Sequence, residues 1–180
     1  VDEDLACAMY EELAERALVA GFRQYEIANF AKDVPANRPS GVCDPPARAC
    51  RHNANYWRGG DYHGLGPSAT GYVRGVRTKN WSNTQLYCEQ LEKGKRAIES
   101  REELSPLTRA GETAAFGLRM TAGWPFEVFR RTTGYDLREQ WSADMTACVQ
   151  RGWGHLSGDR FRLTRQGLRF ADAAAELFLR

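Results

Sequence analysis

Long apolar runs and charge of one sign are both missing from this sequence. No stretch approaches the roughly 20 apolar residues that a transmembrane helix needs. The first residues lack the basic and apolar regions of a secretory signal peptide. The 25 basic and 23 acidic residues leave a formal net charge of +2, which gives no overall field to attract nucleic acid or a membrane surface. These absences favour a cytoplasmic protein without a membrane span.

A disulfide framework is also missing. The chain has five cysteines, an odd number, and they are too scattered for such a framework. This pattern is more consistent with a reducing compartment. The closest pair, Cys43 and Cys50, has six residues between its members and lies in a proline-rich segment. Two unrelated surface thiols, or a transient metal or redox role, are both compatible with that spacing.

The length of 180 residues, 42% of them hydrophobic, allows a real core in one domain or two small ones. The pattern over Asp2–Ala20 predicts a helix that ends at Gly21, and Phe22–Ala31 alternates like a strand. A helix, a glycine turn and a strand form the unit of an α/β barrel. Four prolines predict an irregular surface loop over 33–49. Because the helical pattern starts at the first residues, we expect a fragment of a longer protein.

The stretch richest in side-chain chemistry is 51–71, which shows no amphipathic period. His52 offers an imidazole that can ligate a metal such as haem iron. Tyr56 and Trp57 offer flat apolar faces to a planar ligand. Three arginines could pair with carboxylates: Arg48, Arg51 and Arg58. The alternative is structural, with His52 and its neighbour Asn53 satisfying buried backbone groups in a turn and the two rings filling the core.

Further along, the pattern predicts a short strand over Tyr72–Arg77, a helix over 84–92, and a domain boundary near 94–104 that divides the chain into 1–94 and 95–180. The C-terminal part then gives three helices, a hairpin and a last helix, the order of a winged-helix-like domain. The signals are a cap at Ser105 with Pro106, a helix over 125–131, a helix from Asp136 to Gly152, strands over 153–156 and 160–163, and a cap at Thr164.

Three sequence segments together resemble the oxygen-independent coproporphyrinogen III oxidase family of radical-SAM proteins: Tyr25–Ala31, Arg51–Tyr62 and Gly64–Ala69. Within the family the chain is most similar to the haem chaperone branch, whose hallmark is an H-N-x-x-Y-W motif. An R-L-T-x-x-G motif of the family's C-terminal domain is matched at Arg162–Gly167. The resemblance implies an α+β fold: the closing segment of a partial α/β barrel of radical-SAM type, followed by the winged-helix-like domain.

The resemblance also implies site residues. His52 is expected to hold haem iron, with Tyr56 and Trp57 flanking the macrocycle, Asn53 orienting the site, and haem passing to a recipient haemoprotein. The three arginines at 48, 51 and 58 suit the haem propionates. A loop near the cofactor end of the barrel, where relatives bind S-adenosylmethionine, is expected at Gly64, Gly66, Ser68 and Ala69.

Radical-SAM chemistry needs three cysteine thiolates on an iron–sulfur cluster, which the family carries as C-x3-C-x2-C. This sequence has no such triplet, so we expect the cluster and S-adenosylmethionine only in the intact protein. Two alternatives to the chaperone stay open. One is a fragment of a coproporphyrinogen oxidase, which decarboxylates two propionates. The other is a DNA-binding winged helix, disfavoured because the recognition-helix candidate Leu137–Arg151 has no net charge.

Overall fold

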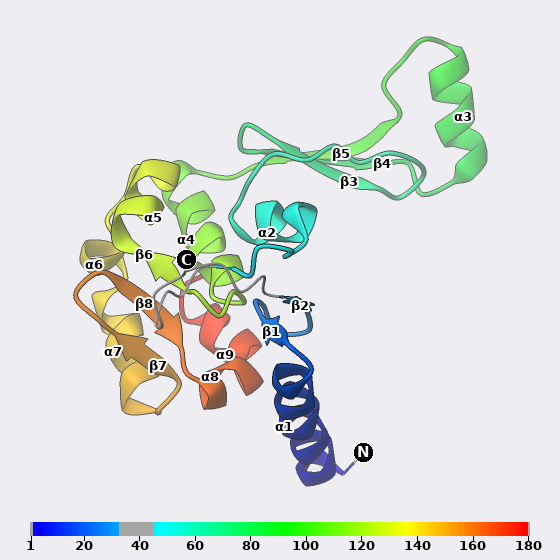
Figure 1. Cartoon of the computed structure of the whole chain (residues 1–180). Coiled ribbons are helices and arrows are strands. Elements are labelled where there is room, and N and C mark those ends of the chain that lie inside the picture. Colours follow the sequence, from blue (N-terminus) through cyan, green and yellow to red (C-terminus); the bar gives the residue numbers. More distant parts are fainter. Residues whose placement is uncertain (1, 33–44, 180) are drawn as a thin grey trace.

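The computed structural model describes residues 2–32 and 45–179, and most of the predicted proline-rich loop, at 33–44, lies outside them. Figure 1 shows a body of helices and a small sheet, an arm of three strands and one helix that extends away from it, and a helix at the N-terminal end. The mixture of helices and open sheets confirms the predicted α+β class. Within the described ranges, no helix is both long and apolar enough to cross a membrane.

The first element is α1 (Glu3–Val19), which confirms the predicted helix. The Asp2 carboxylate accepts a hydrogen bond from the Leu5 backbone N–H at 3.0 Å and caps the helix, and Gly21 with a φ of 79° follows its end. Three of the four apolar positions that predicted the helix, Leu5, Met9 and Leu13, are more than half exposed, and the fourth, Ala17, is partly buried. The four-residue spacing therefore identified the helix, but this face contacts no core.

The predicted single strand over 22–31 is wrong. The chain forms a hairpin of β1 (Phe22–Gln24) and β2 (Phe30–Lys32), which pair antiparallel. Glu26 causes the reversal: its buried carboxylate accepts hydrogen bonds from the Ala28 backbone N–H at 2.9 Å and from the Asn29 side chain at 2.5 Å. Side-chain bonds of this kind to nearby groups replace the ladder of a continuous strand.

The body begins with α4 (Pro106–Gly117), whose Ser105 cap and first-turn proline confirm the prediction. Its sheet has the order β6-β8-β7 and includes the predicted hairpin. The other elements of the body are β6 (Trp124–Pro125), α5 (Phe126–Thr133), α6 (Leu137–Gln140), α7 (Ser142–Gln150), β7 (Gly154–Leu156), β8 (Arg160–Leu163), α8 (Arg165–Arg169) and α9 (Ala171–Glu176).

Two predicted helices of the body are each divided in two. The third breaks at Trp141, whose φ of −124° leaves the helical region so that its indole N–H can donate to the Phe178 carbonyl oxygen at 3.1 Å. The last breaks at Phe170, whose ring stacks on Trp153 with centroids 5.2 Å apart. In both cases a tertiary contact of an aromatic ring overrides the helical periodicity.

The core of the body is built on three rings in edge-to-face contact. Phe129 lies 5.2 Å from Trp124 and 5.8 Å from Trp141, measured between centroids, and all three side chains are fully buried. The Trp124 indole N–H donates to the Ala114 carbonyl oxygen of α4 at 3.1 Å. Gly117 makes this approach possible, because a Cβ there would overlap the Trp124 ring.

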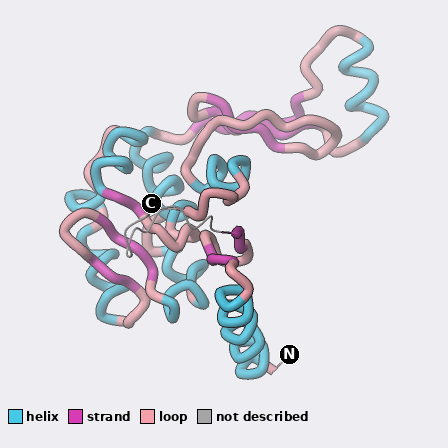
Figure 2. Tube along the Cα trace, viewed as in Figure 1, coloured by secondary structure: helices cyan, strands magenta, loops and turns pink. Residues whose placement is uncertain are grey.

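The arm contains β3 (Thr70–Val73), β4 (Val76–Asn80) and β5 (Ile98–Glu103), in antiparallel order β3-β4-β5, with α3 (Thr84–Glu92) between the last two strands. Figure 2 shows these strands as one long ribbon outside the body. Helix α3 confirms its prediction. The single strand predicted over 72–77 is wrong, because Arg74 and Gly75, with φ of 51° and 83°, form a tight hairpin turn.

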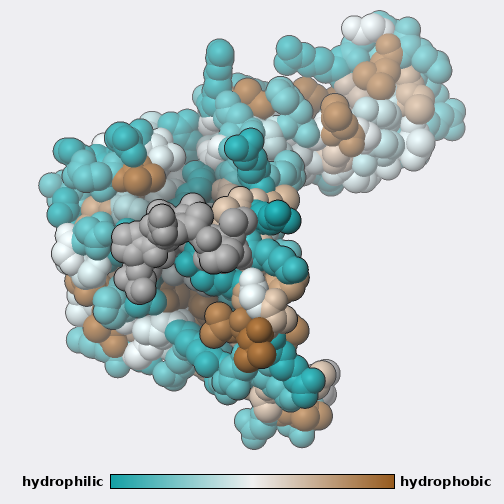
Figure 3. Space-filling view, in the orientation of Figure 1, coloured by the Kyte–Doolittle hydropathy of each residue, from teal (hydrophilic) through white to brown (hydrophobic). Residues whose placement is uncertain are grey.

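Strand β5 runs through the segment where the domain boundary was placed, and the division at 94 stays a prediction. Figure 3 shows brown, hydrophobic surface on the arm around α3. The exposed leucines of the arm are Leu65, Leu86 and Leu91. The arm therefore keeps apolar surface in contact with solvent, unlike the interior of the body.

Candidate functional site

The His-Asn-x-x-Tyr-Trp motif forms a helix, α2 (Arg51–Trp57), and not the turn in which the structural alternative placed His52 and Asn53. Seven residues are too short to show a period, and the helix is held by tertiary contacts. Residues four apart in a helix share a face. His52 therefore stands one turn before Tyr56, and Asn53 stands one turn before Trp57, so the motif presents two adjacent faces.

Trp57 anchors α2 to the rest of the molecule. It packs against a small cluster formed by Tyr25, Ala31 and Met120. The guanidinium of Arg119 lies over its ring, 4.7 Å from the centroid. Its indole nitrogen is buried without a hydrogen-bond partner in the part of the chain that the structure describes. With one ring face covered by Arg119, Trp57 fixes the helix.

Tyr56 belongs to a row of three tyrosines. Its ring lies 4.6 Å from that of Tyr62, which in turn stacks on Tyr72 at 6.1 Å. The Tyr62 hydroxyl donates a hydrogen bond to the Tyr56 hydroxyl at 3.3 Å. Burial, reinforced by that hydrogen bond, raises the pKa of Tyr62 to about 12. The Tyr62 hydroxyl, at the centre of the row, therefore stays neutral at physiological pH.

His52 lies on the exposed side of α2, and its imidazole has no hydrogen-bond partner among residues 2–32 and 45–179. Arg48 and Arg51 beside it are exposed as well. Arg58 differs, because its guanidinium donates to the Gly123 carbonyl oxygen at 2.7 Å and lies 4.6 Å from the centroid of the Trp124 ring. The structure thus leaves two of the three predicted arginines exposed, Arg48 and Arg51, and uses the third to attach α2 to the body.

A cavity of about 240 Å³ adjoins the motif. Tyr56, Arg109 and the other two tyrosines of the row border it, and His52 does not. Arg77, which also borders the cavity, pairs with Glu112 and with Glu102 at 2.6 Å each. Hydrogen bonds to these carboxylates raise the pKa of Arg77. Small-molecule sites usually have about 300–1,000 Å³. The cavity is therefore too small to enclose a tetrapyrrole.

The loop predicted from Gly64 to Ala69 belongs to the arm. The Asn80 side-chain amide donates to the carbonyl oxygens of Gly64 and Gly66 at 3.1 and 3.0 Å. The Ser68 N–H donates to Trp81, and the Ala69 carbonyl oxygen accepts from Asn80. Gly66 has a φ of 96°, and a Cβ at Gly64 would approach the backbone of Thr70 within 2.6 Å. These glycines therefore serve the local fold of the arm.

The comparisons with known proteins agree with this fold. The HemN C-terminal domain model matches residues 104–170. The heme chaperone HemW of Mycobacterium tuberculosis (strain H37Rv) is 30% identical over 178 residues, which cover 99% of this chain and 40% of that protein. The heme chaperone HemW of Escherichia coli (strain K12) is 26% identical over 183 residues, covering 99% of this chain and 43% of that protein.

Among solved structures, coproporphyrinogen III oxidase (HemN) from Escherichia coli, a radical SAM enzyme, aligns with a TM-score of 0.64 at 11% identity, over 94% of this chain and 39% of that chain. At this identity the likeness concerns the fold. Residues 104–170 of this chain match the HemN C-terminal domain, and the chain as a whole is similar to the heme chaperone HemW. It spans about two fifths of the length of the curated relatives that it matches.

Sequence reasoning missed two features near the motif. One is the Arg77 ion-pair network, and the other is the row of tyrosines that borders the small cavity. Alternation of side chains along β3 and β4 was the available signal, because it places Tyr72 and Arg77 on one face. This alternation indicates a common face only once the hairpin of β3 and β4 is known, whereas the sequence pattern predicted a single strand there.

Proposed function

We propose that this chain binds haem at an open surface site on α2 and passes it to a recipient haemoprotein, acting as part of a longer radical-SAM protein. The observation that carries the proposal is the exposed His52 imidazole on a helix that Trp57 holds in place. The names of the matched relatives, heme chaperone HemW, supply the ligand and support its delivery.

In this proposal His52 supplies the axial nitrogen for haem iron, because a neutral imidazole is a common iron ligand. Arg48 and Arg51 precede it in the sequence, are exposed, and pair with the propionates by charge-assisted hydrogen bonds. The side-chain amide of Asn53, next to His52, makes no hydrogen bond with any residue that the structure describes, so it can orient the bound ligand.

The two aromatic residues of the motif take different roles. Tyr56 lies on the same helical face as His52 and borders one edge of the macrocycle. Trp57 lies against the cluster of Tyr25 and Met120 and keeps α2 from moving, in place of the flanking role that the resemblance implied. A rigid support of this kind holds the iron-binding imidazole of His52 in a defined direction.

An open site suits delivery better than retention. A cargo held by one axial ligand and a few surface contacts dissociates faster than one enclosed in a pocket, and residence time is set mainly by the dissociation rate. A recipient protein can then approach the exposed side of the iron and supply its own ligand. The absence of His52 from the border of the 240 Å³ cavity agrees with a surface site.

The iron–sulfur cluster and S-adenosylmethionine of the intact protein are assigned to the part of the relatives that this chain does not span. The described residues contain no group of three or more His, Cys, Asp or Glu side chains that could hold a metal ion. The free cysteines at 7, 50, 88 and 148 are far apart in sequence and do not form the family's cluster-binding triplet. The residues present here therefore do not fit the cluster.

A haem titration followed by absorbance tests the proposal. His52→Ala should weaken binding at this site at least tenfold, or about 1.4 kcal/mol, because the iron loses its ligand. His155→Ala is the matched control, since His155 is also exposed but lies on β7, away from the motif. Equal affinity and equal Soret spectra for the wild type and His52→Ala would refute the assignment. Loaded wild-type protein should also transfer haem to apomyoglobin.

A further inference from the structure

The three-stranded sheet of the arm separates two cavities. Along β3 and β4 alternate side chains point to opposite faces. Tyr72 and Arg77 face the small cavity beside α2, whereas Val73, Val76 and Thr78 face the other side. On that other side, the sheet and α3 enclose a groove of about 600 Å³, within the usual size range of small-molecule sites.

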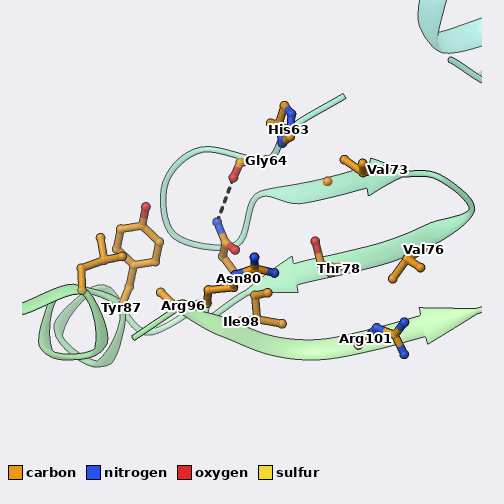
Figure 4. A pocket seen from close by; sticks show the side chains of 13 residues that line it. His63, Gly64, Val73, Val76, Thr78, Asn80, Tyr87, Arg96, Ile98 and Arg101 are labelled. Carbon is orange, nitrogen blue, oxygen red and sulfur yellow. Dashed lines mark hydrogen bonds between the residues drawn. The ribbon is translucent and has the colours of Figure 1, made fainter. Parts of the chain in front are cut away.

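The groove has an apolar floor and an aromatic end wall. Valine side chains of β3 and β4 and Ile98 of β5 form the floor, and Tyr87 and Leu91 of α3 close one end. Figure 4 shows Tyr87 standing at the end of the sheet and the two valines at the opposite end. A flat hydrophobic surface next to a ring suits a planar apolar ligand.

His63 stands at the edge of this groove on a fixed backbone. Tyr62 exchanges backbone hydrogen bonds with Tyr72 at 2.7 and 2.8 Å, and the Asn80 amide holds Gly64 on the other side at 3.1 Å. Because neighbouring side chains of an extended segment point to opposite faces, the Tyr62 ring joins the tyrosine row and His63 turns to the groove. Figure 4 shows the imidazole above the strands.

Two arginines give the groove a positive character. Arg96 lies near Tyr87 and Arg101 toward the other end of β5 (Figure 4). The lining residues of the described chain include no carboxylate. Arg101 pairs with Glu103 at 2.8 Å, but both side chains are about 60% exposed, so the pair is weak and open to exchange with a ligand carboxylate.

We propose that this groove is a second haem site, in which His63 ligates the iron, the apolar floor receives the macrocycle, and Arg96 and Arg101 pair with the propionates. The choice of haem rests on the proposed function of the chain. The site itself rests on the groove, its imidazole and its two guanidinium groups. The groove encloses more of the ligand than the surface of α2 does, so it holds haem longer.

The stoichiometry of haem binding to the chain tests this proposal. The wild type should bind two equivalents, and His63→Ala should bind one, with at least a tenfold loss of affinity for the other. Val76→Trp, which fills the floor without touching the ligand imidazole, should lose the same equivalent. His155→Ala should keep both, and circular dichroism should confirm that each variant is folded.

The propionate contacts are tested with haem dimethyl ester, which has no free carboxylates. Arg96→Ala combined with Arg101→Ala should weaken haem binding in the groove several-fold and leave binding of the ester unchanged. An equal loss for both ligands would overturn the role of the arginines.

The outcomes separate the groove from the site on α2. If His63→Ala keeps the stoichiometry and spectrum of the wild type, the groove proposal is refuted. If the wild type binds one equivalent and His52→Ala loses it, the haem site is on α2 alone, and the groove proposal is refuted as well. If His63→Ala loses one equivalent while His52→Ala keeps two, the groove stands and the assignment of His52 fails.

Discussion

The body and the arm use aromatic residues in opposite ways. In the body, Trp124, Phe129 and Trp141 are fully buried and contact one another edge to face. In the arm and α2, Tyr62 and Tyr72 stay partly exposed and border a cavity. The difference shows that the body has a closed aromatic core, whereas the arm leaves aromatic and apolar side chains partly in contact with solvent.

The largest loss of stability is expected from a substitution in the core of the body. Trp141→Ala removes a buried ring and leaves the Phe178 carbonyl oxygen without its donor, so the free energy of unfolding should fall by about 3–5 kcal/mol. Urea denaturation measures the change. Trp81→Ala, in the partly exposed arm, is the control and should cost clearly less. Equal losses would contradict the contrast between the two regions.

A smaller effect is expected from overfilling the same core. Gly117→Ala places a methyl group against the Trp124 ring, which should lower the free energy of unfolding by about 1–3 kcal/mol. Gly158→Ala is the matched control, because a Cβ there meets nothing within 4 Å. Thermal unfolding of both variants should separate them. A neutral Gly117→Ala would mean that α4 can move away from Trp124.

The smallest effect concerns the tyrosine row. With the pKa of Tyr62 raised to about 12, the folded state holds its proton more tightly than the unfolded state, so stability should decline as pH rises from about 10 to about 12. Ultraviolet absorbance of tyrosinate should show a late-titrating group that Tyr62→Phe removes and the control Tyr135→Phe keeps. A late component that persists in Tyr62→Phe would assign it to another tyrosine.

Elements with local signals were predictable from the sequence. Helix α3 and the start of α4 carry their own caps, Asn83 and Ser105, whose side chains accept hydrogen bonds from backbone N–H groups in the first turn. The two N-terminal hairpins were missed for a physical reason. Their turns depend on the Glu26 carboxylate and on the positive φ of Arg74, and neither residue type is a usual turn signal.

The residues of the proposed site stay a prediction, and their surroundings could not be predicted from the sequence. The resemblance pointed to His52, and the three arginines were singled out because guanidinium groups pair with carboxylates. It could not foresee that Arg58 reaches the Gly123 carbonyl, 65 residues away, or that Trp57 lies under Arg119. The groove of His63 could not be predicted either, because it is assembled from β3, β4, β5 and α3, and none of the three strands was correctly predicted.

The tight turn at Arg74 and Gly75 has a consequence for how the arm can evolve. Inserting one residue into β4 would exchange the two faces of that strand, sending its valine toward the tyrosines and its arginine into the groove. Both cavities would change in a single step. The length of this turn therefore sets the register of β4 against β3, and with it the lining of both cavities. Insertions and deletions in the turn should accordingly change its length by two residues at a time.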